Sequence, residues 1–165
     1  KGLKIRTPGE IQLQKTMEAL GAQVQAINFK ELPMALKQGV VDGQENPLSV
    51  IYHYKLYEVQ PHLALTYHVY NSMMAVASKK TWSKLSADQQ AILKEEAQKA
   101  GQWFRDEQLA ANDDLIQKLK GKGMKVTLPD RAAFKAQMQY AYDAIGEYAG
   151  KDNVAKFLKM VEETQ

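Results

Sequence analysis

The chain has 165 residues, of which 45% are hydrophobic and 25% charged, an ordinary composition for a globular protein of about one domain. Its formal net charge of +3 is small and comes without a basic run or a basic–aromatic array, so nothing in the composition favours nucleic-acid binding. Cysteine is absent, which excludes disulfides and thiolate metal sites, and no apolar run approaches the roughly 20 residues of a membrane span.

The chain opens on Lys1-Gly2-Leu3, with neither an initiator methionine nor a visible signal peptide. Such a start is typical of the middle of a protein. We therefore expect a fragment, or a processed product, of a longer chain.

Short strands and helices alternate in the first third of the sequence. An apolar–basic alternation predicts a strand up to Arg6, and Leu13, Met17 and Leu20 share one face of a predicted helix. The expected strand, helix, strand, helix, strand and helix cover residues 3–6, 10–20, 23–29, 30–38, 40–42 and 47–54. This order predicts a parallel α/β sheet, in which ligands bind beyond the carboxyl ends of the strands. Arg6 and residues 42–46 are therefore expected on one rim.

The stretch 39–48 concentrates the signals for a turn and a helix start. Its first glycine suits the end of the preceding helix, and Gly43 permits a sharp turn. Asn46 is expected to be the N-cap of the next helix, with the proline after it as the first helical residue. Such helix starts attract anions. Either this turn faces a ligand, or Asn46 only caps and the two residues before it are solvated.

The rest of the chain is predicted to be mainly helical. Residues rich in β-formers predict one or two strands within 63–78, interrupted near Asn71-Ser72. Asp130 is expected to cap one helix and Gly150 to precede the last. Further elements are expected as a short helix over 80–84, a long helix from 86 to 119 or 120, and a strand over 124–128.

The long helix begins at a capping box, formed by Ser86 and Gln89. At 1.5 Å per residue it would extend about 50 Å, whereas a small domain measures about 30 Å. Gly101 bends it, or it divides into two helices; the sequence leaves both open. A helix that overshoots its own domain implies a neighbour, in the same chain or another.

Motifs for covalent or cofactor chemistry are missing from the sequence. It contains no nucleophile elbow, phosphate loop or dinucleotide fingerprint, and its histidines lack metal-ligand spacing, so we predict no catalytic residue, cofactor or metal. His53 and His62 are expected at the surface, whereas His68 either lines a cleft or is a partly buried, hydrogen-bonded histidine. Arg6 can bind a carboxylate through two parallel hydrogen bonds, or it is a surface arginine at a strand end.

The sequence resembles the extracytoplasmic solute-binding subunits of tripartite ATP-independent periplasmic (TRAP) transporters, the DctP-like family. The order and spacing of the matching segments hold from residue 1 to about residue 120, whereas residues 121–165 match only in helical character. The matching segments are Gly2-Leu3-Lys4-Ile5-Arg6-Thr7-Pro8, Leu20-Gly21-Ala22, Phe29-Lys30-Glu31-Leu32, Ala35-Leu36-Lys37-Gln38-Gly39-Val40-Val41-Asp42-Gly43-Gln44-Glu45-Asn46-Pro47, Tyr57-Glu58-Val59-Gln60, Thr66-Tyr67-His68 and Trp82-Ser83-Lys84-Leu85.

The resemblance implies an α/β, periplasmic-binding-protein-like fold of two lobes that close on a ligand. This chain would be mostly the second lobe, with a parallel or mixed sheet and long inter-domain and C-terminal helices. Residues 1–78 would form the ligand-binding lobe with hinge-crossing strands, 79–120 the inter-domain helix region, and 121–165 a strand and the C-terminal helices. The first lobe and the signal peptide would lie upstream.

The resemblance also assigns site residues. Arg6 matches the arginine that pairs with the ligand carboxylate, and Asn46 matches an asparagine near it. Phe29 matches an aromatic residue lining the pocket, and His68 a polar position in the cleft. Gly9 stands where some relatives have a polar side chain. Gln44 and Glu45 are expected to buttress Arg6 or the turn.

The function that follows is a periplasmic receptor, not an enzyme, that captures an organic acid and delivers it to membrane permease subunits. The acid and the oligomeric state are left open. One alternative is an α/β enzyme that uses His68 with Asp42 or Glu45 as an acid–base pair. The other is an interaction module whose long helix pairs with a partner or with itself.

Overall fold

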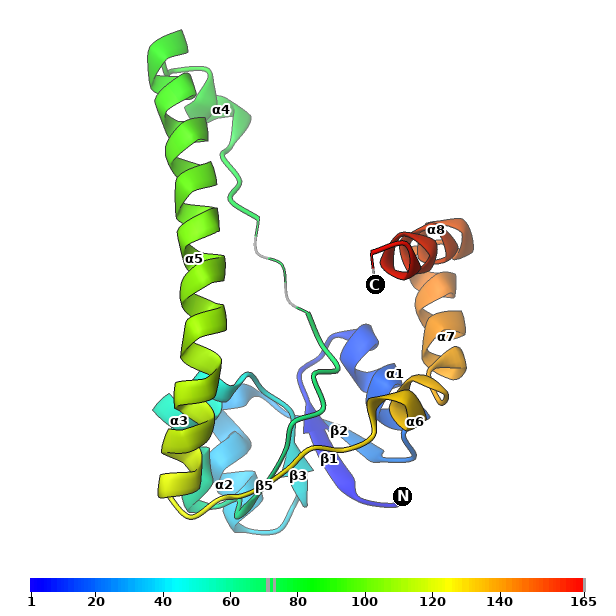
Figure 1. Cartoon of the computed structure of the whole chain (residues 1–165). Coiled ribbons are helices and arrows are strands. Elements are labelled where there is room, and N and C mark those ends of the chain that lie inside the picture. The colour runs from blue at the N-terminus through cyan, green and yellow to red at the C-terminus, as the bar shows by residue number, and fades with distance from the viewer. Residues whose placement is uncertain (71, 73, 165) are drawn as a thin grey trace.

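The computed structural model of the chain describes residues 1–70, 72 and 74–164 (Figure 1). The elements of the first half are β1 (Lys4–Thr7), α1 (Ile11–Ala19), β2 (Gln23–Ala26), the 3₁₀ helix η1 (Phe29–Glu31), α2 (Leu32–Lys37), β3 (Gly43–Gln44), α3 (Leu48–His53), the 3₁₀ helix η2 (Leu56–Glu58) and β4 (His62–Ala64). Those of the second half are α4 (Lys79–Trp82), α5 (Ala87–Gly121), β5 (Lys125–Thr127), α6 (Arg131–Lys135), α7 (Gln139–Ala149) and α8 (Lys151–Glu162).

Three parallel strands in the order β2-β1-β3 form the main sheet, which confirms the predicted parallel α/β arrangement. Within it, Arg6 lies opposite Gln25 on one side and Gln44 on the other. A second sheet pairs β4 with β5, also in parallel. Figure 1 shows α2, α3 and the lower end of α5 on one side of the strands and α1 and α7 on the other. Helices on both faces are what a parallel sheet requires.

The region 39–48 is built differently from the prediction. Gly39 has φ 70° just after α2, as expected for a helix end. The strand, however, is Gly43–Gln44 and not 40–42, and Gly43 has no positive φ. The predicted turn at Gly43 is therefore wrong: the residue is a glycine because a Cβ there would lie 3.0 Å from Cδ1 of Ile5 on β1.

The predicted cap at the next helix is also wrong. Pro47, and not Asn46, is the N-cap of α3, and its start has no side-chain cap. The Asn46 side-chain amide instead donates to Oε1 of Gln44. Proline before the first helical residue fixes the chain direction without needing a side-chain acceptor. Asn46 is thereby turned back toward the end of β3.

The hydrophobic core lies on the side of the main sheet that α2 and α3 cover, where these helices meet β4 and the end of α5. Leu32, Leu56 and Leu119 are almost fully buried there. Burial of one leucine contributes about 2 kcal/mol. The whole buried cluster is Leu32, Ala35, Leu36, Val41, Ile51, Leu56, Leu63, Leu119 and Met124. Helix α2 thus contributes Leu32, Ala35 and Leu36 to the core.

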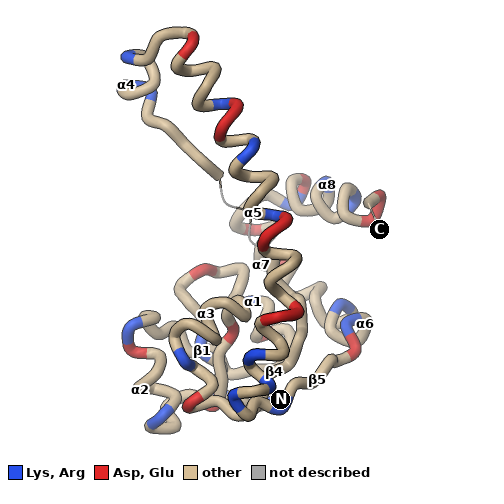
Figure 2. The backbone as a smooth tube through the Cα atoms, turned by 60° about the vertical axis from the view of Figure 1, so that its left-hand side comes forward, with Lys and Arg blue, Asp and Glu red and all other residues tan. Residues whose placement is uncertain are grey.

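Helix α5 is one continuous helix of 35 residues, which passes through Gly101 without a break and is about 52 Å long. Its capping box between Ser86 and Gln89 is present as predicted. Only its last part, from Leu115 onward, is buried; Trp103 and Leu109 are 63% and 74% exposed. Figure 2 shows charges of both signs distributed along the part that leaves the core. No helix in the described part of the chain combines the length and hydropathy of a membrane span.

The strands predicted within 63–78 are largely absent. Only His62–Ala64 forms a strand, and the described residues 65–70, 72 and 74–78 form none; Asn71 and Met73 lie outside the described residues. The last hydrogen bond between the two strand regions runs from the Leu65 amide to the Thr127 carbonyl, because β5 ends at Thr127. A β-forming sequence without a partner strand makes no sheet.

The C-terminal region contains one more helix than predicted. Asp130 caps α6 by accepting from the Ala132 amide (2.9 Å), as expected, but α6 ends at Lys135 and α7 begins at Gln139. Gly150, with φ 92°, then separates α7 from α8 as predicted. The break lets α7 turn and pack against both α1 and α8.

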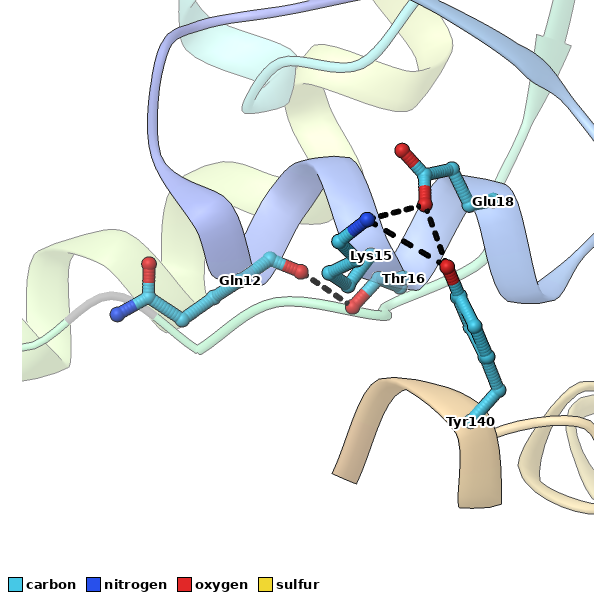
Figure 3. A network of polar contacts seen from close by, with 5 residues as sticks. All are labelled: Gln12, Lys15, Thr16, Glu18 and Tyr140. Atoms are coloured by element: carbon cyan, nitrogen blue, oxygen red, sulfur yellow. Dashed lines mark hydrogen bonds and ion pairs between the residues drawn. The ribbon is translucent and has the colours of Figure 1, made fainter. Parts of the chain in front are cut away.

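A polar network fastens α7 to α1 (Figure 3). Lys15 Nζ lies 2.7 Å from Oε2 of Glu18, and the Tyr140 hydroxyl donates to the same oxygen at 2.9 Å. The hydrogen bond from Lys15, with a smaller contribution from Tyr140, lowers the pKa of Glu18. The hydrogen bonds to Glu18 and Tyr140 raise the pKa of Lys15. The network is partly exposed, so we expect it to position α7 more than to stabilise the fold.

We expect Gly43→Ala to lower the free energy of unfolding by about 1 kcal/mol, because the tip of Ile5 must move away from the new methyl group. Urea unfolding measures this cost. In an Ile5→Val background, which removes Cδ1, the same substitution should cost less. An equal cost in both backgrounds would show that the contact between these residues does not require the glycine.

We expect Tyr140→Phe to speed amide exchange in α7 by roughly twofold at pH 6, because α7 loses its hydrogen bond to Glu18. The folded-state pKa of Glu18 is lowered, so this contribution is present above its ordinary value of 4.5 and is lost as the pH falls through the folded value. The difference from wild type should therefore be smaller at an acidic pH well below 4.5.

Tyr148→Phe is the matched control, because Tyr148 lies on the same helix and is 72% exposed. It should leave exchange unchanged at both pH values. A difference for Tyr140→Phe that persists at low pH would rule out Glu18 as the acceptor that matters.

Candidate functional site

The carboxyl ends of β1 and β3 bring the predicted residues together. Arg6 and Gln44 are register partners on these adjacent strands, and Glu45 and Asn46 follow β3 directly. The expected common rim of Arg6 and residues 44–46 is therefore confirmed. Asp42, expected there too, lies at the other end: it precedes β3, and its Oδ2 accepts from the Lys4 amide at 2.8 Å.

Arg6 is buried, with only 3% of its surface exposed, so it is not the surface arginine of the alternative interpretation. Its Nε donates to the Ile27 carbonyl at 2.8 Å, and its guanidinium carbon lies 5.8 Å from the centre of the Phe29 ring. These two contacts, from the end of β2 and the start of η1, fix the direction of the side chain.

The positive charge of Arg6 has carboxylates in its surroundings but none in direct contact. Within the described residues, no carboxylate oxygen forms an ion pair with it. Burial lowers the pKa of Arg6, while the charges of Glu45 and then Glu10 act in the opposite direction. The guanidinium thus stays cationic at neutral pH and keeps its two Nη nitrogens free of protein carboxylates.

An open hollow of about 710 Å³ adjoins Arg6. Phe29 lines it, and its ring packs edge-on against Tyr54 at a centroid distance of 4.8 Å. Gly9 lines it too and offers only backbone there. The lining residues are Arg6, Pro8, Gly9, Glu10, Ala26, Ile27, Asn28 and Phe29.

Several lining residues were not predicted, among them Glu10 and Asn28. They belong to the loops that follow β1 and β2, so the rule that ligands bind beyond strand ends would have found them. No periodic pattern marks them. The side chain of Asn28 caps η1 by accepting from the Lys30 amide, and Glu10 precedes α1 as its N-cap residue.

The other predicted residues form a separate group, the polar cluster, which does not line the hollow. Its members are the predicted residues Gln44, Glu45, Asn46 and His68, together with Thr66, which was not predicted. Nδ1 of His68 lies 2.6 Å from the Thr66 hydroxyl, and Nε2 lies 3.8 Å from Oε2 of Glu45. Both side chains are mostly buried, His68 at 18% and Glu45 at 12% exposure. Nε2 of His68 is buried without a hydrogen-bond partner among the described residues.

The geometry suits anion binding better than catalysis. Of the acid–base partners considered for His68, Glu45 is close and Asp42 is not. His53 and His62 are exposed as predicted, and the described residues contain no group of three potential metal ligands. A buried cation that opens on a hollow, with an unpartnered imidazole nitrogen in a neighbouring cluster, can hold an acid without reacting with it.

Comparisons with known proteins identify the family of the chain. Residues 1–148 match the family model of DctP, bacterial extracellular solute-binding protein, family 7. The chain is 36% identical over 160 residues to the sialic acid-binding periplasmic protein SiaP of Vibrio cholerae, covering 97% of this chain and 50% of that protein. It is 31% identical over 158 residues to the C4-dicarboxylate-binding periplasmic protein DctP of Rhodobacter capsulatus, covering 93% and 47%.

A solved structure has the same fold. It is a TRAP periplasmic solute-binding protein from Polaromonas sp. JS666 bound to D-erythronate, with a TM-score of 0.82 and 35% identity, covering 94% of this chain and 52% of that one. The chain thus spans about half the length of the relatives it matches. It belongs to the DctP family of TRAP periplasmic solute-binding proteins, which are binding proteins and not enzymes.

Proposed function

We propose that the full-length protein is a periplasmic receptor that captures a carboxylate-bearing organic acid through Arg6 and delivers it to the membrane permease of a TRAP transporter. The observation that carries the proposal is the buried Arg6 guanidinium, which has one hydrogen bond, no ion pair within the described residues, and a hollow beside it. A buried cation of this kind is costly until an anion joins it.

The free nitrogens of Arg6 match a carboxylate. Because Nε is engaged by Ile27, the two Nη nitrogens remain to donate one bond to each carboxylate oxygen. Hydrogen bonds to charged groups contribute about 1.5–3 kcal/mol each. The Phe29 ring beside the guanidinium would exclude water and so strengthen the pair.

The ligands named for relatives support a shared carboxylate anchor. Sialic acid, C4-dicarboxylates and D-erythronate all carry a carboxylate but differ in the rest of the molecule. In this proposal Asn46 and backbone amides orient the acid, and His68 Nε2 offers a partner to a further polar group. Gln44 and Glu45 support them from the end of β3.

The proposal includes a missing first lobe. Residues 1–78 would be the ligand-binding lobe with its hinge-crossing segment, 79–120 the inter-domain helix region, and 121–165 the C-terminal part. The relatives are about twice as long as this chain, and α5 extends far beyond the core. Tyr70, Met74 and Val76 are 84–88% exposed, which suits residues covered by another lobe. Closure of the two lobes around the acid would be a hinge motion.

We expect the full-length protein to bind at least one of N-acetylneuraminate, succinate and D-erythronate in calorimetry. Arg6→Ala should weaken that binding by at least about 100-fold, because two charge-assisted hydrogen bonds are lost. Lys37→Ala is the control, because Lys37 is an exposed cation in the last turn of α2 and does not line the hollow. Unchanged affinity in Arg6→Ala would disprove the anchor.

We also expect Arg6→Met to leave the ligand-free protein as stable as the wild type, or to raise its free energy of unfolding by up to about 1 kcal/mol. A methionine fills the site without a charge to desolvate, although the Ile27 carbonyl loses a donor. Urea unfolding without ligand measures the difference. A loss above about 1 kcal/mol would contradict the claim that the buried charge is costly in the ligand-free protein.

A further inference from the structure

We propose that Arg131 is a positioning residue of the ligand site: its guanidinium, stacked on the Tyr67 ring, holds the backbone turn that presents His68 to the polar cluster. The guanidinium carbon lies 5.7 Å from the centre of that ring. The inference rests on the proposed function, because the position of His68 affects a ligand only if this site binds one.

The turn at Tyr67 is conformationally strained. Its φ is +47°, in the left-handed region, which an aromatic residue with a Cβ seldom adopts. Tyr67 stands between Thr66 and His68, whose side chains contact each other at 2.6 Å. If Tyr67 relaxed to a negative φ, the chain after Thr66 would leave in another direction. His68 would then lose both Thr66 and its approach to Glu45 at 3.8 Å.

Arg131 is well placed to oppose that relaxation. It is the first residue of α6, and Asp130 fixes this helix start by accepting from the Ala132 amide. The preceding strand β5 is tied to β4, and the bond from the Leu65 amide to the Thr127 carbonyl continues this pairing toward Tyr67. Both partners of the stack are thus anchored to the same two-stranded sheet.

The balance between strain and stacking is close. A cation over an exposed aromatic ring and a single left-handed residue are contributions of similar order and opposite sign. Tyr67 is half exposed, and the described residues offer Arg131 no ion pair that would compete for its guanidinium. Removing the stack should therefore shift the turn without unfolding the protein.

The test uses the full-length protein with isotope-labelled histidine and follows the three imidazole signals by NMR without ligand. The His68 signal is assigned with a His68→Gln variant. Arg131→Gln should displace the His68 signal, and Arg131→Lys, which keeps a cation over the ring, should largely restore it. His53 and His62, which are exposed, should not move. Lys94→Gln is the matched control, because it removes a cation that lies 5.7 Å from the ring of Trp82, the last residue of α4.

Binding supplies a second readout. With whichever of the three acids the wild type binds most tightly, Arg131→Gln should weaken affinity by about two- to fivefold, the size of one exposed cation–π contact. An unmoved His68 signal in Arg131→Gln would overturn the inference, as would an equal displacement in Arg131→Lys. If Arg131→Gln moved all three histidine signals, the Tyr67→Leu variant, which removes the ring, would be measured next. The inference requires that this variant displace the His68 signal alone.

This outcome is separable from that of the proposed function. The NMR test needs no ligand, so it stands even if Arg6→Ala binds normally. Conversely, loss of binding in Arg6→Ala with an unmoved His68 in Arg131→Gln would keep the receptor and remove only the role of Arg131.

Discussion

The central place of β1 in the parallel sheet is the constraint on which the site depends. Because β1 pairs with β2 on one side and β3 on the other, its end must lie between the loops that leave both neighbours. Arg6 therefore receives Ile27 and Phe29 from one side and Gln44 from the other. A strand at the edge of the sheet would gain only one of these sets. The close contact at Gly43 is what lets the two-residue strand β3 come near enough to complete the arrangement.

Charge is distributed so that Arg6 stays ionised but has no ion pair among the described residues. Glu45 and Glu10 act on it at a distance, which reduces the lowering of its pKa by burial. Glu45 has a nearer partner in His68, at 3.8 Å, so it is held away from the guanidinium it helps to keep charged. A carboxylate bound directly to Arg6 would orient it equally well but would compete with a ligand. In the arrangement observed, the Ile27 carbonyl orients the side chain by accepting from Nε. Because this carbonyl is neutral, it does not neutralise the positive charge of Arg6.

Sequence patterns predicted most of what is local in this fold. The order of strands and helices, the capping box at Ser86 and the shared rim of Arg6 and Gln44 all follow from periodicity and topology. The predictions fail where the structure of a segment depends on a partner far away in the sequence. Val40 and Val41 are as apolar as strand residues should be, but β1 pairs with Gly43–Gln44. The described β-forming residues after Leu65 have no partner strand once β5 ends. The hollow includes Glu10 and Asn28, loop residues that carry no pattern.

Under the proposed function, the hollow in this chain explains how an acid is held but not how one acid is chosen over another. This chain supplies one cation and one aromatic ring beside the hollow, which suffice to hold a carboxylate but do little to distinguish one acid from another. Its relatives share much of this half and yet are named for different acids. What they share can explain the anchor, and what selects the acid must act elsewhere: in the polar cluster, or on the lobe that would cover α5 and the exposed segment after β4. The position of His68 in that cluster depends on the strained turn at Tyr67. Small changes in this turn would therefore change which acid is selected without moving Arg6, which holds the carboxylate.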